Sequence, residues 1–233
     1  MSKRYLLASA AVATLAATGQ AQARDFYVSV LGGGNWWQDQ SHAGGGESGT
    51  VLHFDADQGF MIGGAVGVHL DNWLRGLRTE LEASYRRNRM NGQWSTSEGD
   101  TGAIIGHVST FALMANVWYD IDIGTKFKPY VGGGAGWARS HIDVALFTSD
   151  GAGRPNPSSE FDVSGFAWQI GAGINYPVMP GVDLGLGYRY SVEPGLSLKN
   201  GGEFGGEGFG GENPFKIENQ NHSVALTLTI DIE

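Results

Sequence analysis

The stretch "TFALMANVWYDIDIGTKFKPYVGGGAGWA", residues 110–138, carries the pattern that decides the fold. From 111 to 119 every second residue is apolar or aromatic, and the alternate positions include the polar residues Asn116 and Asp120. An alternation with a period of two indicates a β-strand rather than a helix. A short connection, 122–126, separates this segment from a second alternating one. The stretch therefore predicts two antiparallel strands joined by a tight turn.

The same alternation recurs along the chain, and no helical pattern of useful length competes with it. It is especially regular in the segments 182–190 and 222–232. Eight strands are predicted, at about 25–36, 60–71, 77–91, 107–121, 127–144, 162–178, 182–196 and 221–232.

The lengths of the connections point to a membrane barrel. Short and long connections alternate strictly, as in bacterial outer-membrane barrels, which have short periplasmic turns and longer extracellular loops. The strands also reach the ~9–11 residues that a tilted strand needs to cross a bilayer. We therefore predict an all-β fold, an eight-stranded antiparallel up-and-down transmembrane β-barrel with both termini on the periplasmic side. The short connections are 72–76, 122–126 and 179–181, and the long ones are about 37–59, 92–106, 145–161 and 197–220.

The N-terminus has the features of a secretory signal peptide. Lys3 and Arg4 precede an apolar stretch, 6–18, that is too short for a membrane-spanning helix, and Ala21-Gln22-Ala23 forms a small-x-small cleavage site. We expect a signal peptide at 1–23 and a barrel domain at 24–233. The chain lacks cysteine, which excludes disulfides and thiolate sites, and its formal charge of -9 argues against a nucleic-acid partner.

One face of the third predicted strand is unusually charged. We expect it to line the lumen, and Arg189 on the seventh strand has the same orientation. In an eight-stranded barrel the third and seventh strands lie opposite each other, so Arg189 would pair with either Glu80 or Glu82 and hold the walls together. The alternative is a set of solvated charges in a wet pore. The expected lumen charge network is Arg78, Glu80, Glu82, Arg86 and Arg189.

The glycines of the opening stretch lack the features of a nucleotide loop. No helix follows them, and neither the dinucleotide fingerprint nor Gly-Lys-Ser/Thr is present, so no cofactor is expected. Gly132, Gly134 and Gly136 fall on the lumen face below Tyr130, where they would form a smooth wall that leaves room for Arg, Glu and Tyr side chains from other strands. Trp118 and Tyr130 also face the lumen and are expected to plug it. Gly133 falls on the lipid face and would ease bending of the sheet.

Two arginines fall on the lipid face of the third strand. Arg87 and Arg89 lie about ten residues beyond the periplasmic turn, near the outer leaflet, where an arginine costs less than the ~2–4 kcal/mol of the bilayer centre. They would bind lipopolysaccharide phosphates through charge-assisted hydrogen bonds. The alternative is simple snorkelling to water. Outward aromatics such as Tyr119 and Trp137 suit the interfacial girdles.

Four stretches resemble a known family: "LRTELEASYRRN" (77–88), "FALMANVWYDI" (111–121), "KPYVGGGAGWA" (128–138) and "LGLGYRYS" (184–191). They are similar to the eight-stranded outer-membrane β-barrel proteins of Gram-negative bacteria, in particular the opacity-protein-like surface antigens of alphaproteobacteria. The resemblance implies outer-membrane localisation, a role in membrane integrity, and host-surface contact through the loops. Members usually end in an aromatic residue that the assembly machinery reads, whereas this chain ends Asp231-Ile232-Glu233.

No catalytic or metal-binding constellation stands out, so we expect a monomeric, non-enzymatic surface protein that contributes to envelope integrity. The main alternative is an adhesin acting through its loops, among them the Gly-, Glu- and Phe-rich 201–215. A small pore is less expected, because eight strands leave a lumen that side chains fill. So is a lipid A hydrolase, which would use His107 and Ser109 with Glu98 or Asp100.

Overall fold

The computed structural model describes residues 26–38, 40–43, 51–95, 101–148, 159–198, 202–204, 207–209 and 215–232. The predicted signal peptide lies outside these residues, as do Glu98 and Asp100 and most of the 201–215 loop. Among the residues that are described, no helix is long and apolar enough to cross a membrane.

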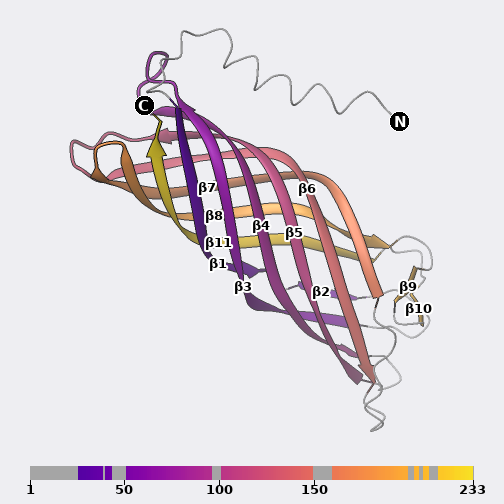
Figure 1. Cartoon of the computed structure of the whole chain (residues 1–233). Helices are drawn as coiled ribbons and strands as arrows, with labels where there is room; N and C mark the ends of the chain where they lie inside the picture. The colour runs from indigo at the N-terminus through magenta and orange to yellow at the C-terminus, as the bar shows by residue number, and fades with distance from the viewer. Residues whose placement is uncertain are drawn as a thin grey trace, which may run out of the picture.

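Eight long antiparallel strands form a closed ring, as predicted (Figure 1). Their order is β1-β11-β8-β7-β6-β5-β4-β3, and β1 also pairs with β3, which closes the barrel. A short strand, β2 (Gln40–Ala43), extends the pairing of β3, and β9 (Gly202–Phe204) pairs with β10 (Glu207–Phe209). The long strands are β1 (Phe26–Trp37), β3 (Val51–His69), β4 (Leu77–Ser95), β5 (Thr101–Asp120), β6 (Lys128–Thr148), β7 (Ser159–Met179), β8 (Val182–Leu198) and β11 (Phe215–Asp231).

The three short connections lie at one end of the barrel, together with the chain ends of β1 and β11. Each contains a glycine with positive φ: Gly76 at 84°, Gly124 at 74° and Gly181 at 72°. This left-handed conformation favours glycine, because an L side chain would clash there. The Ile232 amide donates to the Phe26 carbonyl (2.8 Å) at the same end. The predicted separation of short turns from long loops is thereby confirmed.

The strands extend further into the long connections than predicted. β3 begins at residue 51 rather than 60, β5 at residue 101 rather than 107, and β4 continues to Ser95. The predicted bounds were therefore wrong at the loop ends. The reason is that hairpin pairing continues there, for example between Val51 and Ser95.

The character of the two barrel faces reverses along β4. Near the short turns its outward side chains are apolar, with Leu81 49% exposed, while the inward Glu82 is buried. Beyond Tyr85 the outward residues are polar, and the inward Met90 is apolar and fully buried. An exposed apolar face suits lipid, whereas a polar exterior over an apolar interior suits water. The reversal therefore places the loop-side edge of the membrane near Tyr85.

Outward aromatic residues line this boundary. Seven neighbouring strands contribute one each close to the loop end of their apolar face, which is the girdle arrangement expected at a membrane surface. A second group at the turn end includes Phe26, Tyr119 and Tyr176, each 37–40% exposed. The seven girdle residues are Trp36, Phe60, Tyr85, Phe111, Trp137, Phe166 and Tyr188.

Candidate functional site

The barrel interior is filled with side chains in successive layers, and the layer nearest the short turns is aromatic. The Arg78 guanidinium lies within 5.9 Å of the ring centres of Tyr27, Trp118 and Tyr130. Arg78 Nε also donates to Asp120 Oδ2 (3.0 Å). Cation–π contacts of this kind stabilise a cation that is withdrawn from water. Trp118 and Tyr130, expected to plug the lumen, are both buried inside it.

Glu80 lies beside the aromatic layer and accepts hydrogen bonds from residues around it. Its Oε1 accepts hydrogen bonds from Trp118 Nε1 (2.8 Å) and Asn116 Nδ2 (3.1 Å), and its Oε2 accepts one from Tyr27 Oη (3.0 Å). Arg78 Nη1 lies 3.7 Å from Oε2. Arg189 forms its ion pair with Glu82 rather than with Glu80.

The next layer contains two ion pairs that join opposite walls. Arg189 Nη1 of β8 contacts Glu82 Oε2 of β4. Arg86 Nη1 of β4 lies 2.6 Å from Glu193 Oε1 of β8. Within the ring β4 and β8 are separated by three strands on either side, so each pair crosses the lumen. Glu193 was not singled out from the sequence, although its spacing of four residues from Arg189 gives it the same inward orientation.

A polar network surrounds Glu193 on the loop side of these pairs. Asn219 Nδ2 donates to Glu193 Oε2 (3.3 Å) and to Ser140 Oγ (3.0 Å), and Asn221 Nδ2 donates to Asn219 Oδ1 (2.8 Å). Asn35 Nδ2 donates to Asn221 Oδ1 (2.8 Å). These bonds satisfy polar groups whose burial would otherwise be unfavourable.

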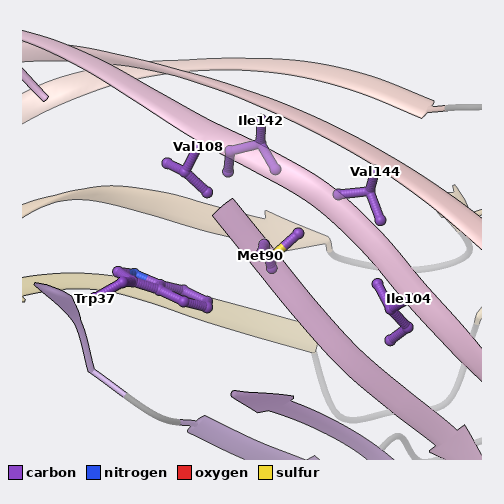
Figure 2. Packing of buried hydrophobic residues seen from close by; sticks show 6 residues of the cluster. All are labelled: Trp37, Met90, Ile104, Val108, Ile142 and Val144. Atoms are coloured by element: carbon purple, nitrogen blue, oxygen red, sulfur yellow. The ribbon is translucent and has the colours of Figure 1, made fainter. Parts of the chain in front are cut away.

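The layer nearest the loops is an apolar cluster, which we call the mouth cluster (Figure 2). Its members come from β1, β4, β5 and β6 and point toward one another in the interior. All are at most 6% exposed. This cluster was not predicted: Trp37 and Ile104 fall in predicted long connections, and the other four positions fall in predicted strands without an assigned role. Its residues are Trp37, Met90, Ile104, Val108, Ile142 and Val144.

The predicted glycine wall is close-packed, but mainly against the adjacent strand. A Cβ added at Gly132 would lie 2.2 Å from the Val117 carbonyl oxygen, and one at Gly134 would lie 2.4 Å from that of Ala115. Gly136 closely approaches the same strand, β5. These glycines leave room for the backbone of β5 and for two of its lumen side chains, Trp118 at Gly132 and Asn116 at Gly134.

Glycines on other strands make room for two tyrosine side chains. A Cβ at Gly187 or Gly173 would lie 2.2 or 2.5 Å from Tyr130 Oη. At Gly67 it would lie 2.2 Å from Tyr27 Cζ. These small residues let the two tyrosines lie across the lumen.

The outward face of β4 to β7 beyond the aromatic girdle forms a second polar surface, the outer rim. Arg87 and Arg89 are exposed there, and no described carboxylate forms an ion pair with either. Arg139 Nη2, by contrast, lies 3.3 Å from Asp162 Oδ2. Asp162 is exposed and lies beyond the girdle, and the hydrogen bond from Arg139 holds the pKa of its carboxyl below the usual range, with a further hydrogen bond to His141.

The two hydrolase candidates also lie on this rim. His107 Nε2 is 3.7 Å from Asp143 Oδ2, a partner that was not predicted. Ser109 lies two residues further along β5 on the same face. In the part of the chain that the structure covers, no hydrogen bond joins Ser109 to His107, and no group of three or more His, Asp or Glu side chains could hold a metal ion.

Comparisons with known proteins agree with this architecture. Residues 5–228 match the outer membrane protein beta-barrel domain family. An outer membrane protein of Gluconacetobacter diazotrophicus is 32% identical over 174 residues, which cover 68% of this chain and 44% of that protein. The match thus spans less than half of that relative.

Two solved structures are similar at low sequence identity. Neisserial surface protein A is 16% identical, with a TM-score of 0.49 and coverage of 89% of this chain and 97% of that one. OprG of Pseudomonas aeruginosa is 13% identical, with a TM-score of 0.48 and coverage of 88% and 96%. From the family match, the curated relative and the closed eight-stranded ring, the chain belongs to the outer membrane β-barrel protein family and resides in the outer membrane of a Gram-negative bacterium.

Proposed function

We propose that the protein is a monomeric, non-enzymatic and non-conducting barrel that contributes to the integrity of the outer membrane. The observation that carries this proposal is the filled lumen, in which two ion pairs join β4 to β8 across the barrel. An eight-stranded barrel has an interior just wide enough for side chains, and here charged and apolar layers occupy it in succession. A barrel whose lumen is filled by side chains and crossed by ion pairs suits a structural role better than a transport role.

Two measurements test this proposal. Purified barrel should give no steady conductance in a planar lipid bilayer, because the Glu82–Arg189 and Arg86–Glu193 layers obstruct the path. Deleting the gene should make cells more sensitive to detergents and large antibiotics, and the wild-type gene should restore resistance. Steady channels, or a deletion strain with unchanged sensitivity, would contradict the proposal.

A lipid A hydrolase is the second candidate, favoured by the contact between His107 and Asp143 beside Ser109 at the outer-leaflet level. A hydrolase of this type needs the serine hydroxyl to donate to the imidazole, and that bond is absent between these two residues. Overproduction of wild-type protein and of Ser109→Ala, followed by mass spectrometry of lipid A, decides the matter. Loss of an acyl chain only with the wild type would establish the enzyme.

An adhesive role is the other alternative, and it finds support in the length of the strands. The strands from β4 to β7 continue past the aromatic girdle, so they carry the loops away from the bilayer surface. Loop-deletion variants that still fold, as judged by heat-modifiable gel mobility, but no longer bind host cells or matrix would favour it. Equal binding by such variants would exclude loop-mediated adhesion.

A further inference from the structure

We propose that Arg87 and Arg89 form a binding site for the phosphorylated headgroup of lipopolysaccharide on the outer face of β4. This inference deepens the proposed structural role, since a barrel that holds neighbouring lipids would strengthen the leaflet. It rests on the height, the free charge and the surroundings of the two side chains.

The position of the site relative to the bilayer follows from the change of the outward face of β4 from apolar to polar. Tyr85 belongs to the aromatic girdle, and Arg87 and Arg89 are the next two outward residues of β4. The two guanidiniums therefore stand just beyond the apolar belt, at the level where lipid headgroups begin. A lipid bound there would keep its acyl chains on the apolar surface around Leu81 and Ala83 below.

The free charge of the site distinguishes it from the rest of the rim. Arg139 is ion-paired with Asp162, whereas no carboxylate with a described side chain pairs with Arg87 or Arg89. The other described acidic groups of this face, Asp143 and Glu160, lie on β6 and β7, and Asp143 contacts His107. Two unneutralised guanidiniums in a chain of net charge -9 complement an anionic ligand.

The neighbours of the arginines suit an amphipathic lipid. Arg87 is opposite Phe60 on β3 and Ser109 on β5 in the strand register. The ring of Phe60 lies 6.1 Å from that of Tyr85, the girdle residue two positions before Arg87 on β4. Aromatic rings provide a flat surface for the glycan and acyl junction, the serine hydroxyl offers a hydrogen bond, and the guanidiniums offer several donors to phosphate.

The test compares purified wild-type barrel with Arg87→Gln/Arg89→Gln, using Arg139→Gln as the matched control. Each protein is refolded in detergent with EDTA, so that divalent cations cannot bridge lipid phosphates to carboxylates of the protein. Each is then titrated with purified bisphosphorylated lipid A or with phosphatidylglycerol. We expect the double variant to bind lipid A at least roughly tenfold more weakly, which corresponds to about 1.4 kcal/mol. Arg139→Gln should bind as the wild type does, because Arg139 is already paired.

Several outcomes would overturn the proposal. These are unchanged lipid A affinity in the double variant, an equal loss in Arg139→Gln, or wild-type affinity for phosphatidylglycerol equal to that for lipid A. Wild-type affinity should also fall with added salt, as expected for exposed charges, and a salt-independent affinity would argue against the site. If the double variant does not fold, as judged by heat-modifiable gel mobility, the single variant Arg89→Gln replaces it, because Arg89 lies further from the apolar belt. Arg89→Gln should weaken lipid A binding severalfold. Unchanged lipid A affinity in this variant would overturn the proposal.

The site and the proposed function fail separately. If the wild-type gene does not restore detergent resistance in the deletion strain, the structural role is wrong, whatever the lipid A affinity. If the wild type restores resistance and the double variant has normal lipid A affinity, the structural role stands and the binding site is wrong.

Discussion

Arg86 on β4 and Glu193 on β8 meet across the barrel, with Nη1 and Oε1 2.6 Å apart. Both side chains are almost entirely buried, at 3% and 1% exposure. Asn219 and Asn221 also donate to Glu193, so the carboxylate is held from several strands. Together with the contact between Glu82 and Arg189, it joins β4 to β8 across the lumen.

Breaking the Arg86–Glu193 pair should destabilise the barrel strongly. Arg86→Met would leave the Glu193 carboxylate buried without its cation, and we expect the free energy of unfolding to fall by about 3–5 kcal/mol. Urea unfolding in detergent micelles, followed by gel mobility, measures the change. The double variant Arg86→Met/Glu193→Leu should recover much of the loss, because no uncompensated charge remains. Equal destabilisation by the single and double variants would contradict this account.

Gly187→Ala should destabilise the barrel through a single atom of Tyr130. A Cβ at 187 would lie 2.2 Å from Tyr130 Oη but 3.4 Å from Cζ. Overpacking of this kind costs about 1–3 kcal/mol. Tyr130→Phe removes the clashing oxygen, so Gly187→Ala should be better tolerated in that background, as a double-mutant cycle of unfolding free energies would reveal.

The control for this cycle is Gly165→Ala. Its Cβ would meet nothing closer than Pro194 Cγ at 3.6 Å, so the substitution should change stability by less than about 0.5 kcal/mol. If Tyr130→Phe gave no relief to Gly187→Ala, the strain would lie in the backbone instead.

Truncating side chains of the mouth cluster should lower the stability of the barrel without making it conduct ions. Met90→Ala removes a fully buried side chain, and we expect a loss of about 2–5 kcal/mol in unfolding free energy. Combining it with Trp37→Ala should still give no steady conductance in a planar bilayer, because the ion-pair layers below remain. Channel openings in this double variant would show that the mouth cluster alone seals the barrel.

The titration of Asp162 should report its contact with Arg139. The Arg139 hydrogen bond lowers the pKa of this carboxyl from its ordinary value of 3.8. The contact therefore contributes stability above the ordinary pKa and loses that contribution as the pH falls through the lowered, folded-state pKa. Carbon-detected NMR should show Asp162 titrating at lower pH in the wild type than in Arg139→Gln. Identical titration midpoints would contradict the contact.

Much of the fold followed from local alternation. The period of two at 111–119 reflects one apolar and one polar side of a strand, and this pattern needs no knowledge of neighbouring strands. The loop ends of the strands were misjudged because the faces reverse outside the bilayer. A residue such as Met90 signals an interior position only once the membrane boundary is known.

The site was only partly predictable for a related reason. The inward orientation of Arg86 and of Arg189 follows from the alternation within each residue's own strand. The choice of ion-pair partner depends on how far neighbouring strands are shifted along one another around the barrel. That displacement places Arg189 against Glu82, while Glu80 bonds Tyr27 and Trp118. The same displacement brings Glu193 to Arg86.

The sequence by itself determined the strands, the short turns and the inward or outward orientation of each side chain, because these depend on residues close together in the chain. Only the tertiary structure decided which charges pair across the lumen and which glycines face Tyr130. Those features depend on the register of strands far apart in sequence, which is set when the ring closes between β1, β3 and β11.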